Sequence, residues 1–439
     1  MMSRQAVDSS EFREMARERK IPLCDFLLRT IKELETPATL FAACPNSEAV
    51  IKASLRAAKR ANAPIKFAAT LNQVDLDGGY TGLNHFEFAE TIKQEAETID
   101  YQGPIIIAVD HGGPWLKDLQ TIENWTLERS MAWIKQSFEA AVEAGYDLIH
   151  VDPTVERTLP PGSNIPIERV VERTIELIEH TERFRRSKQL PPIAYEVGTE
   201  EVHGGLADLT VFDRFLGGLQ AGLTAKGLDD VWPVLVVGKV GTDLHTTFFD
   251  GPLAQILVNK ARAYGSFIKG HYTDYVDNPE DYPRSGIGGA NVGPEFTEEE
   301  YNALVQLSII EEKLYRNHQV VRLSKILDVL ENAVYESGRW KKWLQDEERS
   351  TGFCDLSPKR KAWLIKTGCR YIWSTPQVLA ARNLLYANLT RNGYEPEEMV
   401  LMQIERSMDK YYRAFGLTDL NTRLKPLVHG MTDEGRKQP

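Results

Sequence analysis

Short apolar segments recur along the first two thirds of the chain, and clusters of polar residues follow them. Each segment is apolar throughout rather than alternating, which is typical of strands that helices cover on the outside, and each is too short for a buried helix. Seven segments show this pattern: residues 38–45, 64–73, 104–113, 147–154, 191–200, 233–242 and 265–274. A weaker eighth segment spans residues 285–294. The sequence therefore predicts eight buried strands.

The stretches between these segments favour helices. Residues 46–62, 125–145 and 166–187 place apolar side chains at helical spacing. The second stretch ends in Gly145, as a helix with a glycine cap does. Eight strands alternating with helices over about 260 residues predict an α/β fold, the (β/α)8 TIM barrel. No GxGxxG motif follows the first predicted strand, which disfavours a doubly wound sheet that binds a dinucleotide.

The pattern changes after Pro294, where helical periods replace the short apolar segments. We predict a barrel with an N-terminal helical segment over residues 1–296. Residues 297–439 are expected to form the last barrel helix and a C-terminal α-helical extension. This extension should pack against the barrel or against a neighbouring subunit.

Composition and charge narrow the classes of function. The 439 residues suffice for a barrel with an appended part. Lysine and arginine number 52 against 63 aspartates and glutamates, a net charge of −11, and no basic tract interrupts this balance, which disfavours nucleic acid as a partner. The four cysteines form no CxxC pair of the kind that suggests a cysteine zinc site or redox chemistry. Because the N-terminus lacks an apolar core and no long apolar run occurs, we expect a cytoplasmic protein that does not cross a membrane.

Histidines gather where the predicted strands end, which is where a TIM barrel builds its active site. Five of the nine lie at or just after such ends: His111, His150, His203, His245 and His271. Imidazoles that converge from several strands beside carboxylates suit a divalent metal with an open coordination position. We predict His111, His245 and His271 as the metal ligands. The alternative for each is a hydrogen-bonded residue of the barrel rim.

Other polar residues near the strand ends are candidates for substrate binding. They are Asn72, Gln73, Tyr80, Asp152, Lys239, Lys269, Asp274 and Asn291. Simpler roles compete: Asp152 can cap the next helix, and each lysine can pair with a neighbouring acid rather than with a phosphate. The glycine-rich residues 285–294 offer backbone that could cradle a phosphate, as loops after the last two barrel strands often do.

Several stretches in the same order resemble one family over nearly the whole chain. They are ATLNQVDLDGGYTGL (69–83), VDHGGP (109–114), IHVDPT (149–154), YEVGTE (195–200), HYTDY (271–275), NVGPEFT (291–297) and RSTGFCD (349–355). The family is GatZ/KbaZ, the non-catalytic or chaperone-like subunit of class II tagatose-1,6-bisphosphate aldolase. Residues 238–250 and 277–290 depart from the usual family pattern, so the chain resembles a divergent member whose substrate or role has drifted.

The resemblance implies a barrel related to class II ketose-bisphosphate aldolases, whose catalytic members bind Zn²⁺ through three histidines. Asp110 and His111 match the acid and first ligand after strand three, and His245 and His271 fall where the other ligands are expected. Asp110 would take the C4 hydroxyl proton, and Glu200 would act on the enediolate carbon or a bound water. Zinc is the expected ion, with manganese, cobalt and nickel as alternatives.

Two functions follow from this resemblance. The first is metal-dependent retro-aldol chemistry on a ketose or ketose phosphate in carbohydrate metabolism, as a tagatose-bisphosphate aldolase component or as a ketose 4-epimerase. An epimerase would use the same residues if the aldehyde fragment rotates before the bond re-forms. The second is a non-catalytic subunit that stabilises a separate class II aldolase chain through the helical extension. The expected partners are a small sugar or sugar phosphate and either a second aldolase subunit or further copies of this chain.

Overall fold

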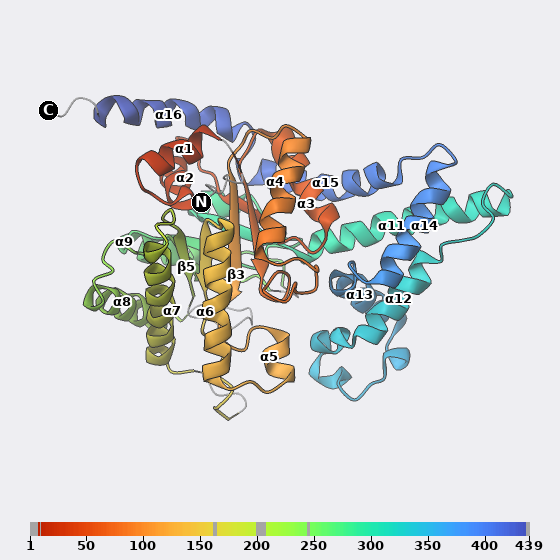
Figure 1. Cartoon of the computed structure of the whole chain (residues 1–439), viewed down its shortest axis with the longest axis horizontal. Coiled ribbons are helices and arrows are strands. Elements are labelled where there is room, and N and C mark those ends of the chain that lie inside the picture. Colours follow the sequence, from red (N-terminus) through yellow and green to blue (C-terminus); the bar gives the residue numbers. More distant parts are fainter. Residues whose placement is uncertain (1–7, 9, 161–164, 199–207, 244–245, 436–439) are drawn as a thin grey trace.

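Eight parallel strands form a closed barrel in chain order, β1 to β8 (Figure 1). The computed structural model describes residue 8 and residues 10–160, 165–198, 208–243 and 246–435. Each predicted segment contains one strand: β1 (Leu40–Ala43), β2 (Ile65–Thr70), β3 (Ile105–Gly112), β4 (Leu148–Val151), β5 (Ala194–Val197), β6 (Leu235–Gly238), β7 (Phe267–Gly270) and β8 (Gly289–Val292). The predicted (β/α)8 TIM barrel is confirmed.

Helices between the strands cover the outside of the barrel. They are α3 (Glu48–Ala61), α4 (His85–Thr98), α6 (Leu127–Ala144), α7 (Ile167–Ser187), α8 (Leu209–Ala225), α9 (Gly251–Ala263) and α10 (Asp281–Ser285). The short helix α5 (Asp118–Ile122) lies instead at the C-terminal mouth of the barrel. Local sequence sets their ends. Thr126 accepts a hydrogen bond from the backbone of Arg129 at the start of α6, and Gly145 ends this helix in the left-handed conformation, as the sequence predicts.

Two N-terminal helices, α1 (Glu11–Glu18) and α2 (Leu23–Lys32), lie against the N-terminal ends of the strands. Arg13 of α1 is buried there between two carboxylates, 2.9 Å from Asp8 and 2.6 Å from Asp147. It also donates a hydrogen bond to the carbonyl oxygen of Ile105 at the start of β3. Because a buried guanidinium needs such partners, this cluster ties α1 to the barrel floor.

The C-terminal helices begin with α11, directly after β8, and extend away from the barrel before returning to it (Figure 1). They are α11 (Pro294–Arg316), α12 (Ile326–Ser337), α13 (Pro358–Gly368), α14 (Pro376–Thr390), α15 (Pro396–Ala414) and α16 (Leu420–Gly435). Helix α15 packs beside α3, where Arg56 and Arg60 both pair with Glu405. The boundary between residues 296 and 297 falls inside α11 and stays a prediction.

No helix in the described part of the chain combines the length and the apolar composition that a membrane crossing requires.

Candidate metal centre

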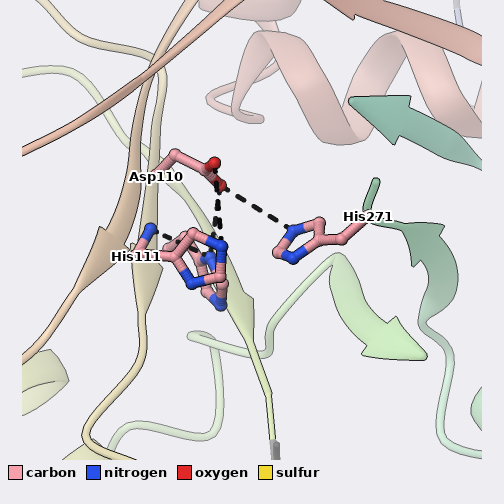
Figure 2. A group of neighbouring side chains, drawn as sticks. Asp110, His111 and His271 are labelled. Atoms are coloured by element: carbon pink, nitrogen blue, oxygen red, sulfur yellow. Dashed lines mark hydrogen bonds and ion pairs between the residues drawn. The ribbon is translucent and has the colours of Figure 1, made fainter. Parts of the chain in front are cut away.

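Three histidines and an aspartate meet at the C-terminal mouth of the barrel. Asp110 and His111 lie at the end of β3, His150 lies on β4, and His271 follows β7. One possible ligand atom of each residue lies within 4.8 Å of those of the other three. The ring centre of His111 is 4.6 Å from that of His271 and 4.9 Å from that of His150. Figure 2 shows Asp110, His111 and His271 pointing toward one another.

The structure thus brings together two of the three predicted ligands, His111 and His271. The third, His245, lies outside the described residues, as do Glu200 and His203. The place beside His111 and His271 is taken by His150, which is a strand-end histidine of the sequence but not a member of the predicted triad. Both His245 and Glu200 stay predictions.

A distortion of β3 aims His111 into the mouth. The pairing of β3 with β4 shifts register between Val109 and Gly112, and His111 adopts a left-handed backbone with φ of 48°. The two glycines that follow allow β3 to approach β4 closely: a Cβ atom on Gly113 would lie 1.8 Å from the carbonyl oxygen of Asp152. The two glycines after His111 are therefore explained by the close approach of the backbone near Asp152.

Asp152 supports His111 from behind. His111 Nδ1 lies 2.6 Å from Asp152 Oδ2, and the Thr154 hydroxyl donates a 2.6 Å hydrogen bond to Asp152 Oδ1. Burial works to raise the pKa of the Asp152 carboxyl, but the contact with His111 outweighs it and lowers the pKa. An ionised Asp152 holds the proton on Nδ1, which leaves Nε2 of His111 able to bind a metal.

Contacts of His150 require opposite tautomers. Its Nδ1 lies 3.3 Å from Asp110 Oδ1 and from Glu196 Oε1, which need a donor, but 3.1 Å from the backbone nitrogen of His111, which needs an acceptor. With the proton on Nδ1, the ring donates to a carboxylate and Nε2 keeps its lone pair. Because an ionised carboxylate is the stronger partner, we assign this tautomer.

Two imidazole nitrogens of the cluster lack a hydrogen-bond partner among the described residues. The Nε2 atoms of His150 and His271 are buried and make no hydrogen bond with any described residue. The nearest carboxylate oxygen to His271 Nε2, Glu196 Oε1, lies 3.5 Å away. Burial and the charge of Lys269 lower the pKa of His271 to about 3, so its ring is neutral at pH 7. Since buried polar atoms normally have hydrogen-bond partners, two nitrogens without such partners fit a divalent metal.

A buried ion-pair network lies beneath the histidines. Glu196 on β5 is fully buried and lies 2.6 Å from Lys269 on β7 and 3.3 Å from Lys66 on β2. Lys269 also lies 3.0 Å from Asp110 Oδ1. Lys269 is a predicted substrate-binding residue, but here it pairs with the two acids. Glu196 is absent from the predicted site, although it lies in the same predicted strand segment, residues 191–200, as Glu200.

The network fixes the charge of the site. Burial works to raise the pKa of Asp110 and of Glu196, but Lys269 and its neighbours outweigh it and hold both pKa values well below the usual range. Asp110, Asp152 and Glu196 then carry three negative charges against the two ammonium groups of Lys66 and Lys269. Leaving the imidazoles aside, one net negative charge remains, which favours a cation at the histidines. Burial works to lower the pKa of His111, but Asp110 and Asp152 outweigh it and raise the pKa, in line with this excess of negative charge.

A cavity of about 1700 Å³ opens above the cluster between the barrel loops and the C-terminal extension. Of the predicted substrate-binding residues, those that line it are Asn72, Gln73, Tyr80, Asp274 and Asn291. Lys239, which follows β6 and is partly exposed, is not among the described residues on its wall, and neither are Asp152 and Lys269.

The predicted residues on the cavity wall differ in how many of their side-chain polar atoms already make hydrogen bonds. The amide of Asn72 donates to the Leu116 carbonyl, that of Gln73 donates to the Pro45 carbonyl, and the Tyr80 hydroxyl donates to Asn46. The Asn291 amide donates a 3.1 Å hydrogen bond to Asp110 Oδ2, whereas its own oxygen is buried without a partner among the described residues. Asn291 is therefore the amide in this set with an oxygen left for a ligand.

Comparisons with known proteins place the chain in a family. A family model described as "D-tagatose-1,6-bisphosphate aldolase subunit GatZ/KbaZ-like" matches residues 27–429. A curated relative from Klebsiella pneumoniae, "D-tagatose-1,6-bisphosphate aldolase subunit GatZ", is 25% identical over 88% of this chain and 91% of its own length.

Two solved structures share the fold. A probable tagatose 6 phosphate kinase from Sinorhizobium meliloti is 20% identical, with a TM-score of 0.69 over 86% of this chain and 100% of its own. A fructose-bisphosphate aldolase from Campylobacter jejuni is 12% identical, with a TM-score of 0.50 over 90% of this chain and 95% of its own. At these identities the likeness concerns the fold alone.

Proposed function

This chain belongs to the D-tagatose-1,6-bisphosphate aldolase subunit GatZ/KbaZ-like family, and from that premise we propose that it performs metal-dependent retro-aldol chemistry on a ketose or ketose phosphate. Membership confirms the resemblance seen in the sequence and gives the chain an aldolase-related role in carbohydrate metabolism. The observation that carries the proposal is the cluster of His111, His150 and His271 beside Asp110, with two bare imidazole nitrogens.

His111, His150 and His271 would hold the ion, and His245 stays a further candidate ligand outside the described residues. When bound, a divalent ion supplies a Lewis acid that polarises the ketose carbonyl and stabilises the negative charge that develops on its oxygen. Imidazole ligands suit zinc, and manganese, cobalt and nickel remain alternatives because affinity order alone does not select among them in a cell.

Asp110 is the proposed acid and base for the C4 hydroxyl. It lines the cavity, and its two oxygens are oriented by Lys269 and by the Asn291 amide. It would accept the hydroxyl proton as the C3–C4 bond breaks and return it when the bond forms. Its low pKa makes it a weak base in the free protein, so proton transfer must accompany bond cleavage rather than precede it. Glu200 keeps its proposed role at the enediolate carbon.

Cleavage and C4 epimerisation use the same residues, and one experiment separates them. We would incubate the metal-loaded chain alone with D-tagatose 1,6-bisphosphate and follow the products by NMR. Triose phosphates indicate an aldolase, and D-fructose 1,6-bisphosphate indicates C4 inversion. If this ketose, its monophosphates and free D-tagatose all stay unchanged, the isolated chain does not perform this chemistry.

The second candidate function is a non-catalytic subunit that stabilises a separate class II aldolase chain. One structural observation favours it: the Lys269 ammonium lies against Asp110, so a fixed cation already occupies one face of the proposed acid–base residue. The curated relative is also named a subunit. In this case the isolated chain would lack turnover, while adding it to a class II aldolase chain would raise the thermal stability of that chain. Turnover by the isolated chain would contradict a purely supporting role.

Asp152→Asn should weaken metal binding by about 10- to 100-fold, because the change removes the charge that holds the proton on His111 Nδ1. A competition titration with a chromophoric zinc chelator measures this affinity. Asp118→Asn is the matched control: it removes a carboxylate of the same cavity that contacts Arg339 and Lys342 instead. Equal zinc affinities in Asp152→Asn and the unmodified protein would show that Asp152 does not support a ligand.

A further inference from the structure

The C-terminal extension supplies one wall of the cavity and brings a buried arginine to it. Two short segments, Arg339–Trp343 and Cys369–Tyr371, face the barrel mouth from between the helices of the extension. Arg370 lines the cavity, yet only 8% of its surface is exposed. A cation so enclosed normally contacts an anion, because removing a guanidinium from water is costly without one.

Arg370 differs from the other cations of the wall in having no anion. Four described residues on the wall are lysine or arginine, and three of them contact carboxylates: Lys117 with Asp75 and Asp77, Arg339 with Asp118, and Lys342 with Asp118. The Nε atom of Arg370 donates a 2.9 Å hydrogen bond to the Thr367 carbonyl. Its two terminal nitrogens make no hydrogen bond or ion pair with any described residue.

Aromatic rings hold the guanidinium in place. Its central carbon lies 4.9 Å from the ring centre of Trp343 and 5.5 Å from that of Tyr371. With Nε bonded to Thr367, the side chain is fixed at one end while the paired terminal nitrogens remain available. Such a fixed pair of N–H donors matches the two oxygens of a carboxylate or of a phosphate.

Arg370 also lies close to the loop that carries the metal ligand His271. Burial and the neighbouring Glu295 raise the pKa of Asp274 to about 7, and the charge of Arg370 acts in the opposite direction on that carboxyl. Both Asp274 and Arg370 line the cavity. A ligand held at the histidines and reaching along this loop would therefore approach Arg370.

We propose that Arg370 binds an anionic end group of the substrate, a phosphate or a carboxylate, at the end of the molecule distant from the metal. The position of the reacting carbons rests on the function proposed above, whereas the anion site rests on the enclosed, unpaired guanidinium. The extension thus selects charged over neutral sugars, and Arg370 is a specificity-determining residue rather than a catalytic one.

The test uses three six-carbon probes that lack a carbonyl and cannot be cleaved: D-glucitol 6-phosphate, D-gluconate and D-glucitol. Titration calorimetry on the protein as purified should show that one of the anions binds at least about 10-fold more tightly than D-glucitol. The preferred anion then identifies the end group as a phosphate or as a carboxylate. Equal binding of all three probes would overturn the proposal.

Arg370→Gln should weaken binding of the preferred anion by about 10- to 100-fold and leave D-glucitol binding unchanged. Arg370→Lys keeps the charge but loses the paired donors, so its affinity for the preferred anion should lie between those of the unmodified protein and of Arg370→Gln. The lysine variant also serves as the test if the glutamine variant does not fold. Arg316→Gln removes an exposed charge of the same extension and controls for net charge. Unchanged anion affinity in folded Arg370 variants would contradict the proposal.

Metal content and ketose turnover, measured on the same samples, separate this proposal from the proposed function. If neither anion is preferred over D-glucitol while metal content and turnover are intact, the anion site is contradicted and the proposed function is not. Anion binding that depends on Arg370 in a chain without metal or turnover supports the anion site and contradicts the retro-aldol function.

Discussion

Replacing His271 by alanine should remove the bound metal and lower retro-aldol turnover by at least about 10³-fold, while the chain stays folded. His271 is a cavity-lining ring whose Nε2 makes no hydrogen bond with the described residues, so its loss leaves no carboxylate without a compensating cation. Lys269 still pairs with both Asp110 and Glu196 in this variant. Elemental analysis, circular dichroism and the NMR assay measure metal, fold and turnover.

His180→Ala is the matched control, because this histidine lies on α7 and contacts Glu139 on the outside of the barrel. It should keep both metal and turnover. A His271→Ala protein that retains stoichiometric metal and full turnover would show that the cluster is not the reactive centre.

Lys269→Met should destabilise the fold by about 3–5 kcal/mol, because it leaves the buried carboxylates of Asp110 and Glu196 without their shared cation. Added zinc should restore part of this loss, since a divalent ion beside Asp110 replaces the missing positive charge. Urea unfolding with zinc and with a chelator measures both effects. Lys260→Met, which removes a partly exposed ion pair with Asp213, should cost at most about 1 kcal/mol.

The stability loss should also depend on pH. Asp110 and Glu196 have depressed pKa values in the folded protein, so they stabilise it above their unfolded values near 4, and this contribution is lost as the pH falls through the lower folded values. Without Lys269 the contribution is already missing at pH 7. The difference between variant and unmodified protein should therefore narrow below about pH 4. A constant difference from pH 7 to pH 3 would contradict the assigned charges.

The barrel could be predicted from the sequence because each strand is a continuous apolar run between helical stretches. All eight strands fall inside the predicted segments. The convergence of Asp110, His111 and His271 also follows from this fold, since the ends of parallel barrel strands meet at one mouth.

Site residues that lie within the strands are less predictable from the sequence than those at the strand ends. His150 pairs in register with Glu196 across β4 and β5, and both side chains reach the cluster. Alternation along each strand gives the inward faces, but the register between strands decides which inward residues are level, and no local pattern fixes it. The sequence alone predicts Lys269 as a substrate-binding residue, because the two acids that it pairs with lie on other strands and are not its neighbours in the sequence.

No local pattern in the sequence predicts that Arg370 belongs to the site. Arg370 lies far along the chain from His271, with the end of the barrel and much of the helical extension between them. Its place on the cavity wall depends on how that extension folds back over the barrel mouth. Helical periodicity predicts the helices of such an extension but not their packing. The candidate specificity residue therefore emerges only from the three-dimensional structure.

Anomalous diffraction at the zinc edge, from crystals grown with zinc chloride, tests the central claim most directly. We predict one strong peak at the barrel mouth, about 2.0–2.1 Å from a ring nitrogen of each of His111, His150 and His271. An empty cluster at saturating zinc, or peaks confined to other parts of the molecule, would contradict a metal centre at this site.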